Sequence, residues 1–213
     1  MDGLARLENS IRTNQLNSQA TLTVFLDISQ AFDSVSHNLL LHKIQSLHLD
    51  GNLACFIQDF LFNRTIKVRN DNILSSQHPS PIGLPQGSVI SPTLFNIFIN
   101  DIFSSPFRFD FDFSLFADDI AIWVNDKDPN KCIQKAQQIL YHIEMWSSNN
   151  GLKFSPTKTK ALFSTKKKVP NIPLTLYNHP IEYVKQHKFL GITMDRNLTW
   201  KDHIKDLRLR CEA

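Results

Sequence analysis

The sequence contains only three cysteines, and they lie far apart. Cys55, Cys132 and Cys211 form no CxxC pair and no cluster with histidine, so their spacing indicates neither a zinc site nor a disulfide framework. Reduced thiols are the common state in intracellular proteins. We therefore expect an intracellular protein, located in the nucleus, in the cytoplasm or in both.

Long apolar runs are missing as well. The chain has no stretch of about 18 consecutive apolar residues, which is the length that predicts a membrane-spanning helix. Its first residues, Met1-Asp2-Gly3, lead into a polar and charged segment that is not typical of a signal peptide. These features predict no membrane partner.

Charge of neither sign dominates the composition. The chain has 23 Lys and Arg residues against 20 Asp and Glu residues, a net charge of +3 and a sequence pI near 8.7. This mildly basic balance permits a nucleic-acid partner without requiring one. With 213 residues, of which 42% are hydrophobic, the composition is typical of a globular domain rather than of a disordered chain.

Two adjacent aspartates, Asp118 and Asp119, interrupt an otherwise apolar run at residues 113–123. Such a run predicts buried strands, and an ionised carboxylate is costly in that setting unless a cation compensates it. A tight turn between two strands would let both carboxylates approach one metal ion, whereas neighbours on a straight strand point to opposite faces. A polar hairpin tip is the alternative, and this stretch alone does not decide between the two.

Helical and strand patterns divide the rest of the chain. Apolar residues at helical spacing predict helices at residues 2–13, 38–47, 52–62, 91–101, 129–149 and 198–209. β-branched, aromatic and alternating patterns predict strands at residues 21–28, 64–69, 152–154, 161–164, 181–184 and 188–194. Ser36 and Ser91 are well placed as helix N-caps. Basic and apolar residues alternate at 64–69, which fits either a solvated edge strand or a strand that contacts a phosphate backbone.

A second aspartate, Asp27, lies near the end of the strand predicted at residues 21–28. Two carboxylate-tipped strands lying side by side would form a site for a divalent cation. An oxygen-rich site that leaves positions for substrate phosphates suits Mg²⁺. Two such ions about 4 Å apart can stabilise the attacking and leaving oxygens of a phosphoryl transfer. The pattern therefore predicts a magnesium site at Asp27, Asp118 and Asp119.

Five segments, in order along the chain, resemble the palm motifs of reverse transcriptases. These are a first palm motif at 25–35 (FLDISQAFDSV), a Pro-Gln-Gly motif at 83–95 (GLPQGSVISPTLF), a metal-binding hairpin of the non-LTR form at 116–119 (FADD), a lysine-bearing motif at 151–160 and a primer grip at 188–192 (KFLGI). The tail at residues 190–200 (LGITMDRNLTW) is similar to the jockey-like polymerases of non-LTR retrotransposons. The resemblance spans roughly residues 22–209.

The resemblance implies a catalytic or metal-binding role for several of the matching residues. Asp27 and Asp118 would ligate both metal ions, the backbone carbonyl of Ile28 would add a ligand, and Asp119 would support the site. Lys158 would protonate the leaving pyrophosphate, with Lys160 as second choice. Lys158 also fits a solvated turn lysine.

The resemblance also implies contacts with substrate. Phe32 stands at the steric-gate position, where an aromatic ring would exclude the 2′-OH of a ribonucleotide. Gln86 and Gly87 would contact the incoming nucleotide and the template strand. Composition alone favours Phe32 as a core residue, and Gln86 could simply cap the helix that follows it.

The fold implied by the resemblance is an α+β palm, an antiparallel sheet with helices packed on one face, and with the fingers and thumb largely missing. We expect residues 1–20 to form an N-terminal helix, a remnant of the junction between fingers and palm. Residues 21–195 would form the palm domain, and residues 196–213 would begin a truncated thumb. The chain is thus expected to be a palm-centred fragment of a longer polymerase.

The function implied is RNA-directed DNA polymerisation, the addition of dNTPs to a DNA 3′ end on an RNA template with two Mg²⁺ ions. The partners would be an RNA template, a DNA primer and dNTPs, with fingers and thumb from a longer parent chain. The alternative is a truncated, catalytically inactive retroelement relic that at most binds nucleic acid. A group II intron-type maturase shares the palm, but Phe116-Ala117 and Leu198-Thr199-Trp200 argue against it.

Overall fold

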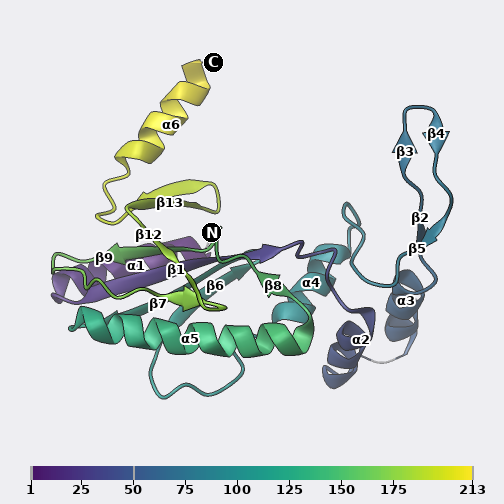
Figure 1. The fold of residues 1–213 in the computed structure, drawn as a ribbon, viewed down its shortest axis with the longest axis horizontal. Helices are drawn as coiled ribbons and strands as arrows, with labels where there is room; N and C mark the ends of the chain where they lie inside the picture. Colours follow the sequence, from purple (N-terminus) through teal and green to yellow (C-terminus); the bar gives the residue numbers. More distant parts are fainter. Residues whose placement is uncertain (1, 50, 213) are drawn as a thin grey trace. The chain divides into compact units, whose positions relative to one another are not determined.

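The computed structural model describes residues 2–49 and 51–212 (Figure 1). The chain divides into two compact units. The sheet unit comprises Met1–Ser29, Pro106–Trp146 and Phe154–Ala213. The helical unit comprises Gln30–Ser105 and Ser147–Lys153.

A mixed sheet forms the centre of the sheet unit. Its strand order is β12-β9-β1-β7-β6. These strands are β12 (Glu182–Val184), β9 (Lys160–Ser164), β1 (Ala20–Ser29), β7 (Asp119–Asp126) and β6 (Asp112–Phe116). Neighbouring strands are antiparallel, except that β12 runs parallel to β9. β1 therefore lies between β7 and β9, away from both edges.

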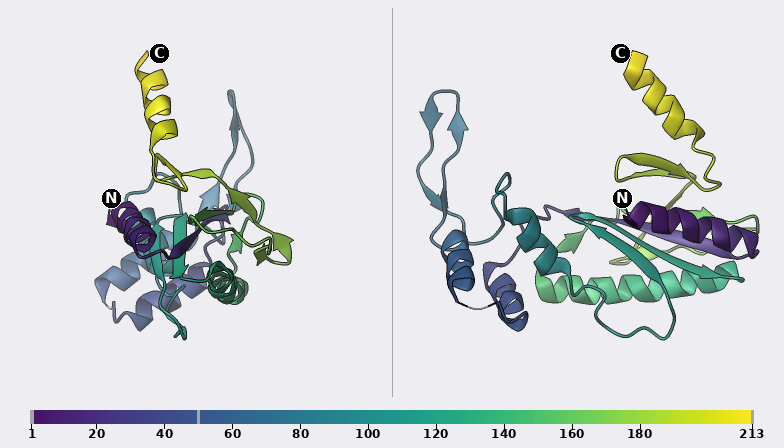
Figure 2. Two further views of the ribbon diagram at one scale, coloured as in Figure 1. Left: turned by 90° about the vertical axis from the view of Figure 1, so that its left-hand side faces the viewer. Right: turned by 180° about the vertical axis from the view of Figure 1, so that it is seen from behind.

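Both faces of this sheet are covered by helices. Along β1, alternate side chains point to opposite faces, and the face of Phe25 packs against Leu7 and Ile11 of α1 (Asp2–Leu16). Helix α5 (Pro129–Asn150) runs along the sheet on the side opposite α1 (Figure 2, left). Each buried side chain of this size stabilises the fold by about 1.5–3 kcal/mol.

The α+β class predicted from the sequence is confirmed, but two details differ. The prediction placed helices on one face only, whereas α1 covers the second face because its apolar stripe needs a partner as much as that of α5 does. The prediction of a fully antiparallel sheet fails at β12, which joins β9 in the parallel sense.

Two short hairpins and a terminal helix complete the sheet unit. The hairpins are β10 (Thr175–Leu176) with β11 (His179–Pro180), and β13 (Gln186–Phe189) with β14 (Ile192–Asp195), and the helix is α6 (Lys201–Glu212). A further two-residue strand, β8 (Lys153–Phe154), pairs with β1. Phe189 and Met194 of the β13–β14 hairpin join the same buried cluster as Phe25. The Asp195 carboxylate accepts hydrogen bonds from the backbone N–H groups of Thr199 and Trp200, just before α6.

The helical unit contains three helices and a long exposed arm. The helices are α2 (His37–Ser46), α3 (Asn52–Leu61) and α4 (Ser91–Ile99). The arm consists of β2 (Thr65–Ile66), β3 (Arg69–Asn70), β4 (Ile73–Leu74) and β5 (His78–Pro79), and it extends beyond α3 (Figure 1). The prediction of a single strand at residues 64–69 is therefore wrong. The chain forms two separate two-residue strands there, since β2 pairs with β5 and β3 pairs with β4.

Two predicted caps have different outcomes. The Ser36 side chain accepts a hydrogen bond from the backbone N–H of Leu39, which confirms it as the N-cap of α2. Ser91 is not the cap of α4. It is the first residue of that helix, and its hydroxyl donates instead to the backbone carbonyl of Pro85, at 2.7 Å. None of the helices described in residues 2–49 and 51–212 is both long enough and apolar enough to cross a membrane.

Candidate active site

Asp27 lies near the C-terminal end of the central strand, β1. The residue directly opposite it on β7 is Asp119. Directly opposite residues of an antiparallel pair project their side chains from the same face of the sheet. The two carboxylates therefore share one face, at one end of the β1–β7 pair.

A two-residue loop, Ala117-Asp118, joins β6 to β7, because Phe116 pairs with Asp119. Ala117 has a φ of 53°, a left-handed value that two-residue hairpin turns require and that residues with a Cβ seldom adopt. The turn places Asp118 in the loop and Asp119 at the first position of β7. Both residues are accessible to solvent, although the Asp119 carboxyl group is partly buried.

The three carboxylates are close enough to affect one another. The pKa of Asp119 is raised above its ordinary value, first because of partial burial and then because of the negative charges of Asp118 and Asp27. A raised pKa means that the folded chain disfavours the ionised form of this side chain. A cation bound here would reverse that effect.

The donor set fits a hard divalent cation. The Oδ2 atom of Asp27 is buried and accepts no hydrogen bond from the described residues. Across residues 2–49 and 51–212 no group of three or more His, Cys, Asp and Glu side chains has the arrangement of a complete metal site. Mg²⁺ is commonly held by one or two carboxylates, with substrate phosphates and water as the other ligands. An unsatisfied carboxylate beside two others matches that requirement.

Lys158 is the cation that the fold places beside Asp27. The turn at residues 155–158 is attached to β1, because the Ser155 N–H donates to the backbone carbonyl of Asp27 at 2.8 Å. The Lys158 Nζ atom lies 3.5 Å from Asp27 Oδ2. This is an ion pair without a well-formed hydrogen bond, and the Lys158 side chain is 70% exposed. A pair of this kind is worth about 0–1 kcal/mol, so Lys158 remains free to move.

Lys160 has different partners. Its Nζ atom donates to the Glu182 carboxylate and to the backbone carbonyl of Thr157, each at 2.7 Å. Glu182 lies opposite Lys160 in the parallel pairing of β12 with β9. The two lysines that the sequence left as alternatives thus have different surroundings, since Lys160 is bound to Glu182 of the edge strand β12 and Lys158 lies beside Asp27.

Ile28 follows Asp27 on β1, and its side chain is buried. Of the predicted catalytic residues, the sheet unit brings together Asp27, Asp119 and Lys158, with Asp118 in the adjoining loop.

The other predicted site residues, Phe32, Gln86 and Gly87, lie in the helical unit. The Phe32 ring is half-buried and stacks on the ring of Phe95, with centroids 4.9 Å apart. Gln86 and Gly87 occupy the middle of a turn that closes with a hydrogen bond from the Ser88 N–H to the Pro85 carbonyl. Gly87 has a φ of 86°, as the third residue of a type II turn requires. Gln86 does not cap α4, because its amide donates to Asp33.

One polar contact in this region was missed by reading the sequence. Asp33 lies inside the motif at residues 25–35 but received no role there. Its Oδ1 atom accepts a hydrogen bond from Gln86 Nε2 at 3.1 Å. The two residues are 53 positions apart, so only the fold brings them together.

Comparison with known proteins gives a consistent result over nearly the whole chain. The family described as reverse transcriptase (RNA-dependent DNA polymerase) matches residues 2–194. The RNA-directed DNA polymerase from mobile element jockey of Drosophila melanogaster is 30% identical over 210 residues, which cover 96% of this chain and 23% of that relative. The probable RNA-directed DNA polymerase from transposon BS of the same organism is 31% identical over 196 residues, covering 88% of this chain and 21% of the relative.

A solved structure shares the fold. Apo telomerase from Candida tropicalis, truncated from the C-terminal domain, superimposes with a TM-score of 0.65 at 14% identity, over 94% of this chain and 39% of that chain. At this level of identity the likeness concerns the fold alone. The chain spans about a quarter of the length of the curated relatives it matches.

Proposed function

The chain belongs to the reverse transcriptase family, and we propose from this premise that it is the palm-centred part of an RNA-directed DNA polymerase of a non-LTR retrotransposon. The observation that carries the proposal is the pairing of Asp27 with Asp119 at the end of β1 and β7, with Asp118 in the adjoining loop. Carboxylates in this arrangement suit the binding of divalent metal ions, which the family generally uses. The named relatives are polymerases of mobile elements, which supports the same assignment.

Two Mg²⁺ ions would be held by Asp27 and Asp118, with the carbonyl of Ile28 as a further ligand and Asp119 in support. When bound, the ions would stabilise negative charge on the reacting phosphate oxygens. The residues of the chain would orient the primer 3′ end and the triphosphate around this point. The unsatisfied Oδ2 of Asp27 and the raised pKa of Asp119 support the assignment, because a cation would relieve both.

Lys158 would supply the proton for the leaving pyrophosphate. Its ammonium group lies beside Asp27 and is mostly exposed, so it can turn toward a bound triphosphate. Lys160 is the weaker candidate, because Glu182 and Thr157 already hold its ammonium group.

Substrate selection would depend on residues of the helical unit. Phe32 would block the 2′-OH of a ribonucleotide, and its stacking on the fully buried Phe95 would keep the ring in place. Gln86 and Gly87 would contact the incoming nucleotide and the template strand. The partners are thus an RNA template, a DNA primer and dNTPs, with fingers and thumb from a longer parent chain.

Primer extension tests the proposal. The chain is incubated with poly(rA), oligo(dT), dTTP and Mg²⁺, and the matched control is Asp118→Asn, a nearly isosteric change that removes one charge. We expect extension by the chain and none by the variant. Extension that persists in Asp118→Asn would contradict the site. Binding of poly(rA)/oligo(dT) without extension would instead support the alternative, an inactive relic that binds nucleic acid.

A further inference from the structure

The carboxylate of Asp33 accepts a hydrogen bond from the carboxamide of Gln86, Nε2 to Oδ1, at 3.1 Å. We propose that Asp33 is a positioning residue that holds the Gln86 carboxamide in one orientation for the incoming nucleotide. This inference rests on the proposed function and adds to it a positioning residue to which the sequence motifs assign no role.

Backbone hydrogen bonds on both sides of Asp33 fix its distance from Gln86. The Leu84 N–H donates to the carbonyl of Phe32, and the Gly83 N–H donates to the carbonyl of Val35, each at 2.8 Å. Asp33 lies between these two acceptors in sequence, and Gln86 follows the two donors closely. The hydrogen bond between the two side chains is therefore supported by backbone hydrogen bonds between the segments that carry them.

Gly83 allows this close approach. Its φ is 86°, and a Cβ added there would lie 2.8 Å from the backbone oxygen of Asp33 and 3.0 Å from its Cα. Any other residue at this position would push the two segments apart. The Gly83 carbonyl is in turn bound by His37 Nε2 at 2.7 Å and by Arg64 Nη1 at 3.1 Å. Residues 32–37 and 83–86 thus form one connected structure.

The chemistry of the pair determines how the amide is oriented. An ionised carboxylate only accepts hydrogen bonds, so the NH₂ group of Gln86 must face Asp33 and the Oε1 atom must point elsewhere. The second Nε2–H also remains available. A free glutamine could rotate about its side-chain bonds and present either group to a ligand. Holding it in advance reduces the entropy that nucleotide binding would otherwise lose.

The surroundings leave room for a ligand. A pocket of about 500 Å³ lies within the helical unit, lined by Asp33, Arg64, Ile66 and residues 79–86. Gln86 is exposed at this pocket, on the turn whose Pro85 carbonyl accepts a hydrogen bond from Ser91 at 2.7 Å. The fixed amide is therefore accessible to solvent and to a nucleotide.

The test measures the affinity for dTTP in two ways. One is equilibrium binding of dTTP in the presence of Mg²⁺ and template–primer, and the other is the KM for dTTP in primer extension. The variants are Asp33→Ala, Asp33→Asn, Gln86→Ala and the double variant, and Asp59→Ala is the control that removes an exposed carboxylate from the same unit. Asn at position 33 keeps an oxygen that can accept the Gln86 hydrogen bond, so it should rescue the loss.

We expect Asp33→Ala to weaken dTTP binding and raise its KM by about fivefold, with kcat and the melting temperature nearly unchanged, because one exposed hydrogen bond is lost. The same change in a Gln86→Ala background should add nothing. Additive effects, or equal losses in Asp33→Asn and Asp33→Ala, would overturn the inference. If the variants show the expected pattern of dTTP affinities but neither the parent chain nor any variant extends the primer, the polymerase proposal would be overturned and the role of Asp33 would stand.

Discussion

The two ends of the β1–β7 pair each carry an acidic residue, and the fold treats these residues in opposite ways. At one end Asp126 lies opposite Ala20, and at the other Asp119 lies opposite Asp27. Both ends belong to the sheet unit and share the same two strands. The difference between them therefore arises from what surrounds each carboxylate.

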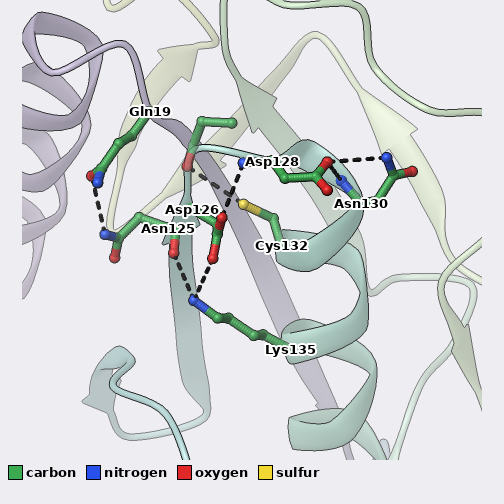
Figure 3. Close-up of polar contacts among 8 residues, drawn as sticks. Gln19, Asn125, Asp126, Asp128, Asn130, Cys132 and Lys135 are labelled. Atoms are coloured by element: carbon green, nitrogen blue, oxygen red, sulfur yellow. Dashed lines mark hydrogen bonds and ion pairs between the residues drawn. The ribbon is translucent and has the colours of Figure 1, made fainter.

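The carboxylate of Asp126 is fully provided with partners (Figure 3). It accepts hydrogen bonds from Lys135 Nζ at 2.9 Å and from the Asp128 N–H at 3.0 Å. Lys135 also donates to the carbonyl of Asn125. Burial alone would raise the pKa of Asp126, but these hydrogen bonds and the nearby lysine charges outweigh it, so the pKa is lowered. This end joins β7 to α5.

The carboxylates at the other end are held less firmly, because the Lys158 Nζ atom lies 3.5 Å from Asp27 Oδ2 and the Lys158 side chain is 70% exposed. Asp27 Oδ2 accepts no hydrogen bond from the described residues, and the pKa of Asp119 is raised by burial and by its acidic neighbours. A protein retains an unfavourable cluster of this kind where a function needs it. An acid at a strand end is thus structural where a mostly buried lysine and a backbone N–H group bind it, and it is a candidate for metal binding where the neighbouring lysine is mostly exposed and makes no well-formed hydrogen bond.

The largest expected effect is on the rate of primer extension. It distinguishes Asp118 from Asp128, two aspartates that lie in loops at opposite ends of the β1–β7 pair. Asp118→Asn should slow primer extension by more than about 1000-fold, because Asp118 is a proposed metal ligand and such a ligand would contribute several kcal/mol to the stability of the transition state. Asp128→Asn should leave the rate per folded molecule unchanged, since the Asp128 side chain accepts hydrogen bonds from Asn130 at the start of α5. Single-turnover extension rates check this prediction, and similar losses in both variants would remove the distinction.

The next effect concerns the two lysines. Lys158→Ala should lower the rate of extension on the order of 100-fold, as expected for loss of the proposed general acid. Lys160→Ala should leave the rate nearly unchanged, because its ammonium group is bound to Glu182. Single-turnover extension rates of both variants decide the matter, and a loss confined to Lys160→Ala would reverse the assignment.

A smaller effect is expected on stability at the structural end. Asp126→Ala removes two hydrogen bonds to a mostly buried carboxylate and leaves the Lys135 ammonium group without its carboxylate partner, with only the Asn125 carbonyl among these acceptors, so unfolding should become easier by about 1–3 kcal/mol. Denaturant unfolding measures this change. Asp112→Ala provides the matched control, because its ion pair with Arg6 is about half exposed and should contribute little.

The smallest effect is a pair of opposite pH dependences. The pKa of Asp126 is lowered from 3.8, so its stabilising contribution is complete above that value and is lost as pH falls through the folded pKa. The pKa of Asp119 is raised from 3.8, so the folded state is destabilised as pH rises through the folded pKa.

At pH 7 Asp126→Asn should therefore be less stable than the parent chain, and Asp119→Asn should be slightly more stable. The difference for Asp126→Asn should shrink as pH falls from 3.8 through the lowered folded pKa, whereas the difference for Asp119→Asn should shrink at higher pH, as pH falls through the raised folded pKa toward 3.8. Unfolding free energies measured at pH 3 and pH 7 test the signs, and a less stable Asp119→Asn at pH 7 would contradict the account of this end.

Local patterns predicted much of the fold. Helix α5 was placed at residues 129–149 and is observed at Pro129–Asn150, because Pro129 and the Asn149-Asn150-Gly151 segment are strong local signals. The cap at Ser36 was likewise predictable. The role of Ser91 was not predictable, since its hydroxyl binds the carbonyl of Pro85, six residues earlier in the chain, and only the folded loop brings the two together. The position of α1 on the second face also depends on tertiary packing that no local window contains.

The candidate site shows the same division. The aspartates were singled out because carboxylates stood in apolar runs, a signal present in the sequence itself. The choice between Lys158 and Lys160 depended on Glu182, which only the parallel pairing of β12 with β9 brings near. The hydrogen bond between Asp33 and Gln86 likewise spans 53 positions and carries no pattern in the sequence.

The most direct measurement is a crossed comparison of Asp27→Asn and Asp126→Asn, with primer extension and unfolding measured on the same preparations. The account predicts that Asp27→Asn loses extension while it unfolds at the same denaturant concentration as the parent chain, and that Asp126→Asn unfolds more easily but keeps its extension rate per folded molecule. Extension by Asp27→Asn at the parental rate, or equal losses per folded molecule in both variants, would contradict the claim that only one end of the β1–β7 pair is catalytic.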